Sequence, residues 1–391
     1  MYIKRDAQKI IQKLIRQYPA VVLTGPRQSG KSTLAKHLLP GAAYASLEDL
    51  DEREFARSDP RGFLKRFANG GIIDEIQKLP ELVSYLQSFL DNKKKQAPII
   101  LTGSAQLTLL ANVSQTLAGR TAIIELLPLA YQELKKSQVV PKSLEQLLVK
   151  GFYPRLYKEK INQSDWYQDY VKTYIERDIR DLLKIHNLGV FQRFLKMCAG
   201  RAGQVLNLSS LANDCGISHS TAFAWFNILE ATYIIFRLEP HYKNFSKRLI
   251  KSPKLFFYDT GLLCFLLDVK SAAELETFQF RGAIMENWAA TELIKARFNA
   301  HKPKNCYFWR DNKGNEIDFI IEHGQKLIPV EIKSGLTIAA DFFKNIFYWS
   351  KLAGNLSGKG YLIYGGEIDQ SRTDINVLGW KSIEKMMKLL A

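Results

Sequence analysis

The stretch GPRQSGKSTL, residues 25–34, has two glycines five positions apart, and a lysine and a serine follow directly. The apolar segment AVVLT precedes it at 20–24, and KSTLAKHLL at 31–39 has the character of a helix. A strand, a glycine loop and a helix in this order are typical of a phosphate-binding loop, where backbone N–H groups and the helix N-terminus face the phosphates. The stretch therefore predicts binding of ATP or GTP.

Individual residues of this loop have expected roles. Lys31 would reach the β- and γ-phosphates, and Ser32 would hold Mg²⁺. The glycines let the backbone turn toward the phosphates, and Arg27 can face them from inside the loop. The residues expected at the nucleotide are Gly25, Arg27, Gly30, Lys31, Ser32 and Thr33.

Two further apolar segments end in polar side chains. GGIIDEIQ, residues 70–77, ends in adjacent carboxylates: Asp74 would join the Mg²⁺ shell, and Glu75 would deprotonate the attacking water. The alternative is a strand with an exposed acidic turn. APIILTGSA follows and ends with Thr102 and Ser104, of which Ser104 would sense the γ-phosphate unless this is a structural turn. The repeated pattern predicts an α/β fold with a parallel sheet, helices on both faces and the ligand at the carboxyl ends of the strands.

Composition limits the class of protein. The 391 residues suffice for roughly two to four domains. The net charge of +16 favours a polyanionic partner such as DNA, held mainly through its phosphates, although a generally basic protein stays an alternative. Four widely spaced cysteines indicate neither a disulfide framework nor a zinc site. The start lacks a signal-peptide pattern, and no window approaches a membrane span of about 18 apolar residues, so we expect a cytoplasmic protein without membrane contact.

The middle of the chain has a helix–turn–helix pattern. NLSSLANDCGISHSTAFAWFNILE, residues 207–230, reads as two helices around Gly216, and the segment after it reads as a β-wing. The second helix has few long polar side chains, so we do not expect it to read base sequence. Two roles for this segment therefore remain as alternatives, contact with the DNA backbone and packing against protein. The wing residues expected to contact phosphates are Lys243, Lys247, Arg248, Lys251 and Lys254.

A second α/β pattern follows, and four of its polar residues are candidates for a metal site. Glu286 lies in the helical segment 281–298, Asp318 in a strand, and Glu331 and Lys333 are two apart in PVEIKSG. Residues two apart on a strand share a face, so these side chains can converge. Carboxylates there would hold Mg²⁺ or Mn²⁺, with the metal ligands Glu286, Asp318 and Glu331, while Lys333 would orient water. The alternative is a strand with solvent-facing charges.

These segments together resemble a known family. GPRQSGKSTL, GGIIDEIQ, the run from IILTGSAQ to LAYQEL, and SPKLFFYDTGLL are similar to the prokaryotic AAA-like ATPases that carry a C-terminal domain of unknown function. The resemblance implies an AAA-like ATPase domain at 1–135, a helical connector at 136–195, a winged-helix domain at 196–270 and a nuclease-like domain at 271–391. It also implies that Arg120 is an arginine finger or nucleotide sensor, in cis or from a neighbouring subunit of a homo-oligomer, unless it forms a structural ion pair.

The terminal domain is similar to the PD-(D/E)xK nucleases. Glu286 matches the helix acid, Asp318 the central aspartate, and Glu331 with Lys333 the E-x-K pair, although Ile317 replaces the proline. The resemblance implies metal-dependent cleavage, or a related fold without catalysis. We therefore expect an ATP-hydrolysing protein that associates with DNA and carries a nuclease-like domain. The alternatives are a nucleotide-controlled switch or scaffold that cuts nothing, and a regulator that uses slow hydrolysis as a timer.

Overall fold

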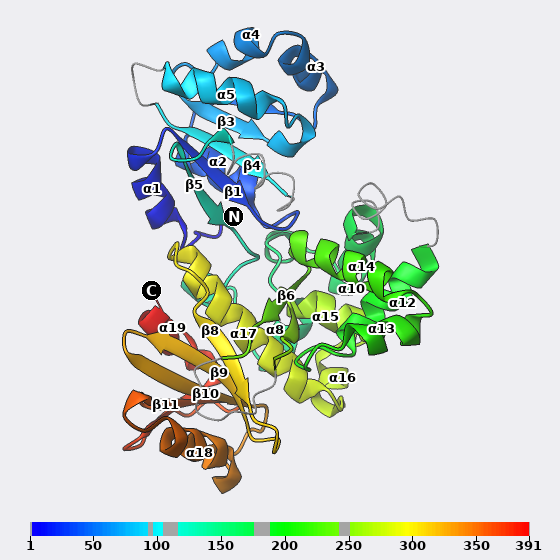
Figure 1. Ribbon diagram of the computed structural model, residues 1–391, viewed down its shortest axis with the longest axis vertical. Coiled ribbons are helices and arrows are strands. Elements are labelled where there is room, and N and C mark those ends of the chain that lie inside the picture. The colour runs from blue at the N-terminus through cyan, green and yellow to red at the C-terminus, as the bar shows by residue number, and fades with distance from the viewer. Residues whose placement is uncertain (1, 93–96, 105–115, 176–187, 242–250, 391) are drawn as a thin grey trace.

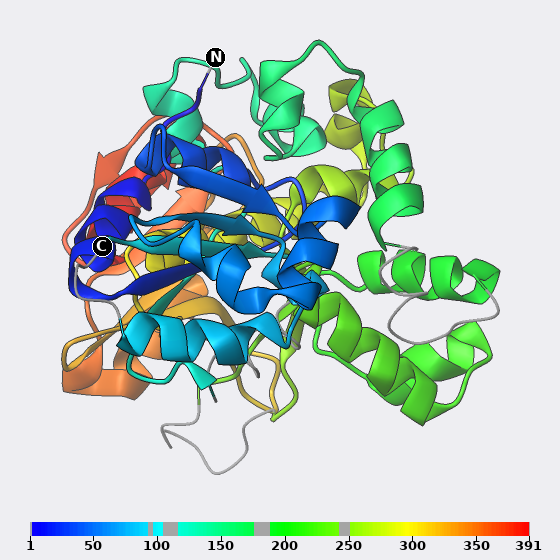
Figure 2. The ribbon, with the colours of Figure 1, turned by 90° about the horizontal axis from the view of Figure 1, so that it is seen from above.

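The computed structural model describes residues 2–92, 97–104, 116–175, 188–241 and 251–390. Three parts follow one another from the top of Figure 1: an N-terminal α/β domain, a helical middle part at the right, and a C-terminal α/β domain at the bottom. Seen from above in Figure 2, the N-terminal domain lies over the C-terminal one and the middle helices extend to one side.

The N-terminal domain is built on a five-stranded parallel sheet in the order β2-β3-β4-β1-β5. Side chains alternate along β1, so Val22 joins the core under α3, α4 and α5, whereas Val21 joins the core under α1 and α2. The fold class predicted for this part is thus present. Its strands are β1 (Ala20–Thr24), β2 (Ala43–Ser46), β3 (Gly71–Asp74), β4 (Ile99–Gly103) and β5 (Thr121–Glu125), and its helices are α1 (Gln8–Gln17), α2 (Lys31–Leu38), α3 (Leu50–Ser58), α4 (Pro60–Lys65) and α5 (Leu82–Asp91).

The middle part is mostly helical and contains the predicted helix–turn–helix elements. Gly216 ends α13 with φ 67°, and Ser218 caps α14 by accepting a hydrogen bond from the N–H of Thr221. Strands β6 and β7 pair antiparallel after α14. The winged-helix assignment itself stays a prediction. The elements are α7 (Tyr131–Lys136), α8 (Leu144–Lys150), α9 (Arg155–Lys158), α10 (Gln163–Tyr170), the π-helix η2 (Val171–Ile175), α12 (Leu188–Ala199), α13 (Leu208–Cys215), α14 (His219–Ala231), β6 (Ile235–Leu238), β7 (Lys254–Phe257), α15 (Thr260–Leu266) and α16 (Ala272–Thr277).

The C-terminal domain has a six-stranded mixed sheet in the order β12-β13-β11-β10-β9-β8. Helix α17 packs on one face through Met285 and Ile294, and α18 packs on the other through Trp349. The elements are α17 (Arg281–Asn299), β8 (Cys306–Arg310), β9 (Glu316–His323), β10 (Lys326–Lys333), α18 (Lys344–Ala353), β11 (Gly360–Tyr364), β12 (Gln370–Ser371), β13 (Ile375–Gly379) and α19 (Glu384–Leu390).

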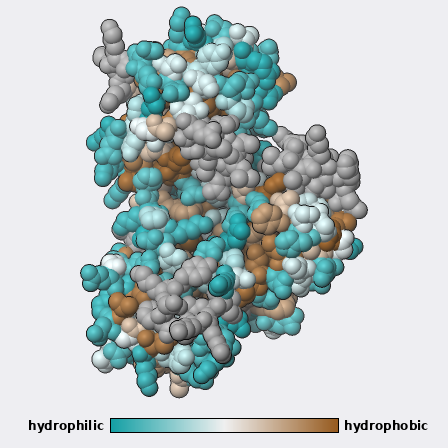
Figure 3. All heavy atoms as spheres, viewed as in Figure 1, coloured by the Kyte–Doolittle hydropathy of each residue, from teal (hydrophilic) through white to brown (hydrophobic). Residues whose placement is uncertain are grey.

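One hydrophobic core runs through the middle and C-terminal parts without a break at residue 271. Helix α17 contacts β7, α8 and α15 of the middle part as well as β10 of its own sheet. In Figure 3, hydrophobic residues gather where the parts meet, while the outer ends of the molecule are mostly polar. Among the described helices, none is long and apolar enough to cross a membrane.

Candidate functional site

The phosphate-binding loop joins β1 to α2 in a conformation that two glycines permit. Gly25 has φ 143°, and a Cβ there would lie 2.2 Å from the carbonyl oxygen of Leu126. Gly30 has φ 94° and directly precedes α2, so that the first N–H groups of the helix open toward the loop. The backbone therefore forms the cradle that the sequence predicts.

Lys31 is buried inside this loop. Its side chain is only 5% exposed, and its Nζ donates to the carbonyl oxygens of Gly25 at 2.9 Å and Pro26 at 2.7 Å. Burial lowers the pKa of Lys31 to about 8, although the nearby Glu75 and Asp74 carboxylates act in the opposite direction. The ammonium is thus held in the loop by weak neutral acceptors that phosphate oxygens can replace.

The two residues predicted to bind Mg²⁺ lie side by side. Ser32 Oγ donates to Asp74 Oδ1 at 2.8 Å, and Thr102 Oγ1 donates to the same oxygen. Tyr44 Oη donates to Asp74 Oδ2 at 2.9 Å, a contact that the sequence did not reveal because Tyr44 lies on β2. A hydroxyl and a carboxylate at the carboxyl ends of parallel strands are oxygen ligands that suit Mg²⁺.

Glu75 lies next to this pair and is held by two neighbours. It has φ 56°, an uncommon left-handed conformation for a residue other than glycine. Gln77 donates from Nε2 to Glu75 Oε2 and, at 3.0 Å, to Ser104 Oγ; Ser104 Oγ is also 3.3 Å from Glu75 Oε2. The structure thus brings Ser104 to Glu75, as expected for a polar group near the γ-phosphate.

Lys31, Ser32 and Glu75 open into one cavity of about 610 Å³ between the N-terminal domain and α9, whereas Asp74 and Ser104 are not part of its lining. Arg155, the first residue of α9, reaches the cavity from the middle part, and Tyr2 lines it from the N-terminal segment. The predicted residues that line it are Gly30, Lys31, Ser32, Thr33 and Glu75. The cavity is large enough for a small-molecule ligand.

Arg5 supports the loop, and no local sequence pattern indicated it. The side chain is 4% exposed; its Nη1 donates to the carbonyl oxygen of Ser29 at 2.7 Å and its Nη2 to that of Leu127 at 2.6 Å. Its Nε is 3.0 Å from Glu133 Oε2. Arg5 therefore ties the phosphate-binding loop to the segment that leaves the sheet after β5.

The two other arginines predicted near nucleotide have different surroundings. The Arg27 guanidinium lies over the ring of Tyr174, with 5.5 Å from Cζ to the ring centroid. Arg120 precedes β5 and pairs with Asp91, with 2.6 Å between Nε and Oδ1. Because β5 runs parallel to β1, Arg120 lies at the amino edge of the sheet, opposite the phosphate-binding loop. A role for Arg120 at the nucleotide of its own chain does not fit this position, whereas a role in trans stays a prediction.

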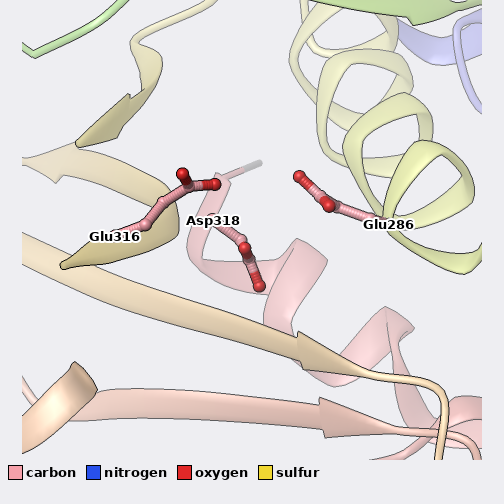
Figure 4. Close-up of side chains that lie close together, drawn as sticks. All are labelled: Glu286, Glu316 and Asp318. Carbon is pink, nitrogen blue, oxygen red and sulfur yellow. The ribbon is translucent and has the colours of Figure 1, made fainter. Parts of the chain in front are cut away.

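The C-terminal domain brings together two of the three predicted carboxylates, Glu286 and Asp318, with a third acid that was not predicted. Oxygens of Glu286, Glu316 and Asp318 all lie within 4.8 Å of one another. Figure 4 shows Glu286 extending from α17 toward the strand that carries Glu316 and Asp318. Glu316 was not among the predicted ligands, although it lies two residues before Asp318 on β9 and so shares its face.

Glu331 and Lys333 border this cluster on β10. Lys333 Nζ is 2.6 Å from Glu331 Oε1, and the Ile332 N–H donates to Asp318 Oδ2 at 2.7 Å. Glu331 is 2% exposed and its Oε2 has no hydrogen-bond partner in the described part of the chain. Burial first and the Asp318 charge second raise the pKa of Glu331 to about 8. A buried oxygen without a partner calls for an explanation, and a cation is one that fits.

Lys254 requires a correction. It was expected on the wing, in contact with phosphate, but it begins β7 with 2% exposure. Its Nζ is 2.8 Å from Glu286 Oε1 and also pairs with Glu316. Packing of β7 against α17 buries it, so it cannot reach DNA on the surface. Lys251 is exposed, and Lys243, Lys247 and Arg248 lie outside the described residues.

Comparison with protein families gives three matches along the chain. Residues 17–135 match the AAA domain. This part of the chain is an AAA-like ATPase domain. Residues 141–273 and 281–383 match two domains of unknown function, DUF8612 and DUF4143. Neither description mentions a nuclease or a winged helix, so both assignments stay predictions.

Similar proteins cover most of the chain. Uncharacterized proteins of Mycobacterium tuberculosis (Rv2008c) and Mycobacterium bovis (Mb2031c) are each 28% identical over 333 residues, covering 84% of this chain and 74% of theirs. A Walker-type ATPase of Pyrococcus abyssi has a TM-score of 0.44 and 13% identity, covering 68% of this chain and 96% of its own. AMPPCP-bound DnaA from Aquifex aeolicus has a TM-score of 0.30 and 14% identity, covering 57% of this chain and 85% of its own.

Proposed function

We propose that this protein hydrolyses ATP in its N-terminal domain, associates with DNA, and cleaves phosphodiester bonds at a divalent-cation site in its C-terminal domain. The AAA match and the geometry of Lys31, Ser32 and Asp74 support the first activity. The observation that carries the last one is the buried Glu331 Oε2, which has no hydrogen-bond partner in the described chain and belongs to a carboxylate beside Asp318 and Lys333.

In the ATPase domain, each polar side chain has a separate task. Lys31 exchanges its loop carbonyls for phosphate oxygens, and Ser32 with Asp74 would hold Mg²⁺, which would neutralise charge on the phosphates. Glu75 accepts the proton of the attacking water, while Gln77 and Ser104 fix its carboxylate by hydrogen bonds. This arrangement supports hydrolysis rather than binding alone.

In the C-terminal domain, Asp318 and Glu331 would hold Mg²⁺ or Mn²⁺. Such a cation polarises a bound phosphodiester and lowers the pKa of a coordinated water. Lys333 is 33% exposed, so its ammonium can orient that water or neutralise the charge that develops on the phosphate. Glu286 completes the acidic face from α17.

DNA association is proposed mainly from charge. The excess of basic residues gives +16, and counterion release makes such a protein bind polyanions without regard to sequence. The exposed residues of α14 include His219, Ser220 and Phe223 but neither Arg nor Lys. This supports contact with the backbone of DNA rather than recognition of bases.

A Mn²⁺ titration with single-stranded, duplex and branched DNA, with and without ATP, tests the proposal. We expect cleavage that Asp318→Asn and Lys333→Ala each abolish while ATP hydrolysis continues. Asp341→Asn, an exposed residue of the same domain, is the matched control and should cut normally. If no substrate is cut and calorimetry finds no cation at Asp318 and Glu331, the cleavage proposal is wrong.

The second candidate is a nucleotide-controlled switch that cuts nothing. It is favoured by the Lys254 ammonium, which already pairs with two of the acidic residues. In that case the C-terminal cluster is a structural ion-pair network, and the same titration would show ATP hydrolysis without cleavage or cation binding.

A further inference from the structure

Lys254 reaches the C-terminal acidic site from another sheet. It is the first residue of β7, which pairs only with β6 among the described strands, whereas Glu316 and Asp318 lie on β9 of the C-terminal sheet. Its Nζ pairs with Glu286 and Glu316, and its side chain is 2% exposed. The site is therefore composite: the C-terminal domain supplies carboxylates and the middle part supplies a cation.

The charges explain why this lysine stays an ammonium. An isolated buried ammonium is costly, but two contacting carboxylates and the nearby Asp318 offset that cost. The Lys254 ammonium contacts both carboxylates directly, so a positive charge lies on the side of the cluster formed by Glu286 and Glu316.

The other side of the cluster differs. Glu331 Oε1 accepts from Lys333 at 2.6 Å and from Asn345 at 3.2 Å, but its Oε2 has no partner within the described residues. Asp318 lies close to Glu286 and Glu316, and its Oδ2 accepts from the N–H of Ile332, the residue after Glu331 on β10. Lys254 thus pairs with the carboxylates of Glu286 and Glu316, whereas Glu331 Oε2 is left without a partner among the described residues.

We propose that the C-terminal site takes one divalent cation, at Asp318 and Glu331, and that the Lys254 ammonium serves as its second cation, at Glu286 and Glu316. Sites with two metal ions hold them about 3.5–4 Å apart and use both to neutralise phosphate charge. Here a side chain of the middle part takes over one of these positions. This inference rests on the proposed divalent-cation site.

The test is the number of Mn²⁺ ions bound by the full chain without nucleotide, measured by calorimetry and by the EPR signal of free Mn²⁺. Asp318→Asn serves as the blank for other weak sites. We expect one equivalent in the wild type, lost in Glu331→Gln and kept in Glu316→Gln. Lys254→Met keeps an unbranched apolar stem but lacks the ammonium and so frees the carboxylates; it should bind two equivalents. The second should disappear in the double variant Lys254→Met/Glu316→Gln.

Thermal unfolding keeps the test decisive if Lys254→Met is unstable. We expect its Tm to fall by several degrees, because Glu286 and Glu316 lose their counter-charge, and to recover when Mn²⁺ is added. Lys254→Arg keeps the charge and should still bind one equivalent. One equivalent in both wild type and Lys254→Met, or two in the wild type, overturns this inference alone. No Mn²⁺ bound by any variant overturns the proposed cleavage site together with it.

Discussion

Arg5 Nη1 donates a hydrogen bond of 2.7 Å to the carbonyl oxygen of Ser29 inside the phosphate-binding loop. The same guanidinium pairs with Glu133, which lies on α7 two residues after Tyr131. The Tyr131 N–H in turn donates to Glu292 on α17 at 2.8 Å, and α17 carries Glu286. Buried polar contacts therefore connect the nucleotide loop with the helix that supplies one acid of the C-terminal site.

Arg5→Met should destabilise the protein and weaken ATP binding. The change leaves the Glu133 carboxylate, which is 0% exposed, without its counter-charge, and removing one partner of a buried pair costs about 3–5 kcal/mol. The change also removes the hydrogen bond from Arg5 to the Ser29 carbonyl oxygen in the phosphate-binding loop. Denaturant unfolding and a titration with a fluorescent ATP analogue measure the two effects. Arg57→Met, which breaks an exposed pair with Glu54, is the control and should cost less than about 1 kcal/mol. Equal losses in both variants would contradict a structural role for Arg5.

Glu75→Gln should bind ATP but lose turnover. The amide keeps the size of the side chain and cannot accept a proton, so we expect kcat to fall about 10²- to 10⁴-fold with Kd for ATP little changed. Lys31→Ala should instead lose binding. Glu81→Gln, an exposed acid nearby, should leave both quantities unchanged. A Glu75→Gln variant with the wild-type rate would remove Glu75 from the mechanism.

The pH dependence of ATP affinity should report on Lys31. Its pKa is lowered to about 8 chiefly by burial, and only the ammonium attracts phosphate. Below pH 8 the ammonium is present and Kd should stay constant. Above pH 8 binding must take up a proton, so Kd should rise by up to about tenfold per pH unit. Calorimetry from pH 6.5 to 9.5 tests this. Lys31→Arg stays charged, so its Kd should not rise in this range. If the Kd of the wild type does not rise above pH 8 either, the pKa of Lys31 is not lowered.

The residues predicted at the nucleotide follow local rules along the chain. A glycine loop between a strand and a helix, and carboxylates at the end of a second buried strand, are set by neighbours along the chain. The parallel sheet then brings Ser32 and Asp74 together. The contact from Arg5 was not predictable in this way, since it depends on how the segment before α1 crosses the loop.

The C-terminal site was predicted only in part. Asp318 and Glu286 lie near each other as expected, and Glu316 could have been found from its spacing of two from Asp318. Glu331 lies on the neighbouring strand β10, where the Ile332 N–H donates to Asp318. Lys254 was misplaced because the helix–turn–helix pattern sets the order of β7 but not its packing against α17. A lysine in a run of basic residues looks like a surface group until that packing is known.

Arg120 should contribute to ATP hydrolysis at the nucleotide site of a neighbouring subunit. It lies at the sheet edge opposite the loop of its own chain. Mixing Arg120→Ala with Lys31→Ala should restore part of the ATPase rate, because one variant offers an intact pocket and the other an intact arginine. The control mixes Arg120→Ala with the double variant Lys31→Ala/Arg120→Ala, which should restore nothing. No recovery, with an ATP-bound monomer by light scattering, would leave Arg120 as a partner of Asp91 only.

DNA affinity should depend steeply on salt and little on sequence. Each phosphate that a lysine or arginine neutralises contributes about −0.9 to the slope of log K against log salt. Replacing Lys247 and Arg248 by alanine should therefore make the slope less steep by about 2 and weaken all duplexes alike, as fluorescence anisotropy at several salt concentrations would measure. Lys295→Met is the matched control: its ammonium is buried and pairs with Glu292, so the slope should not change. A slope that changes equally in both variants would contradict a specific contribution of Lys247 and Arg248. A tight preference for one short sequence that survives high salt would show that bases are read.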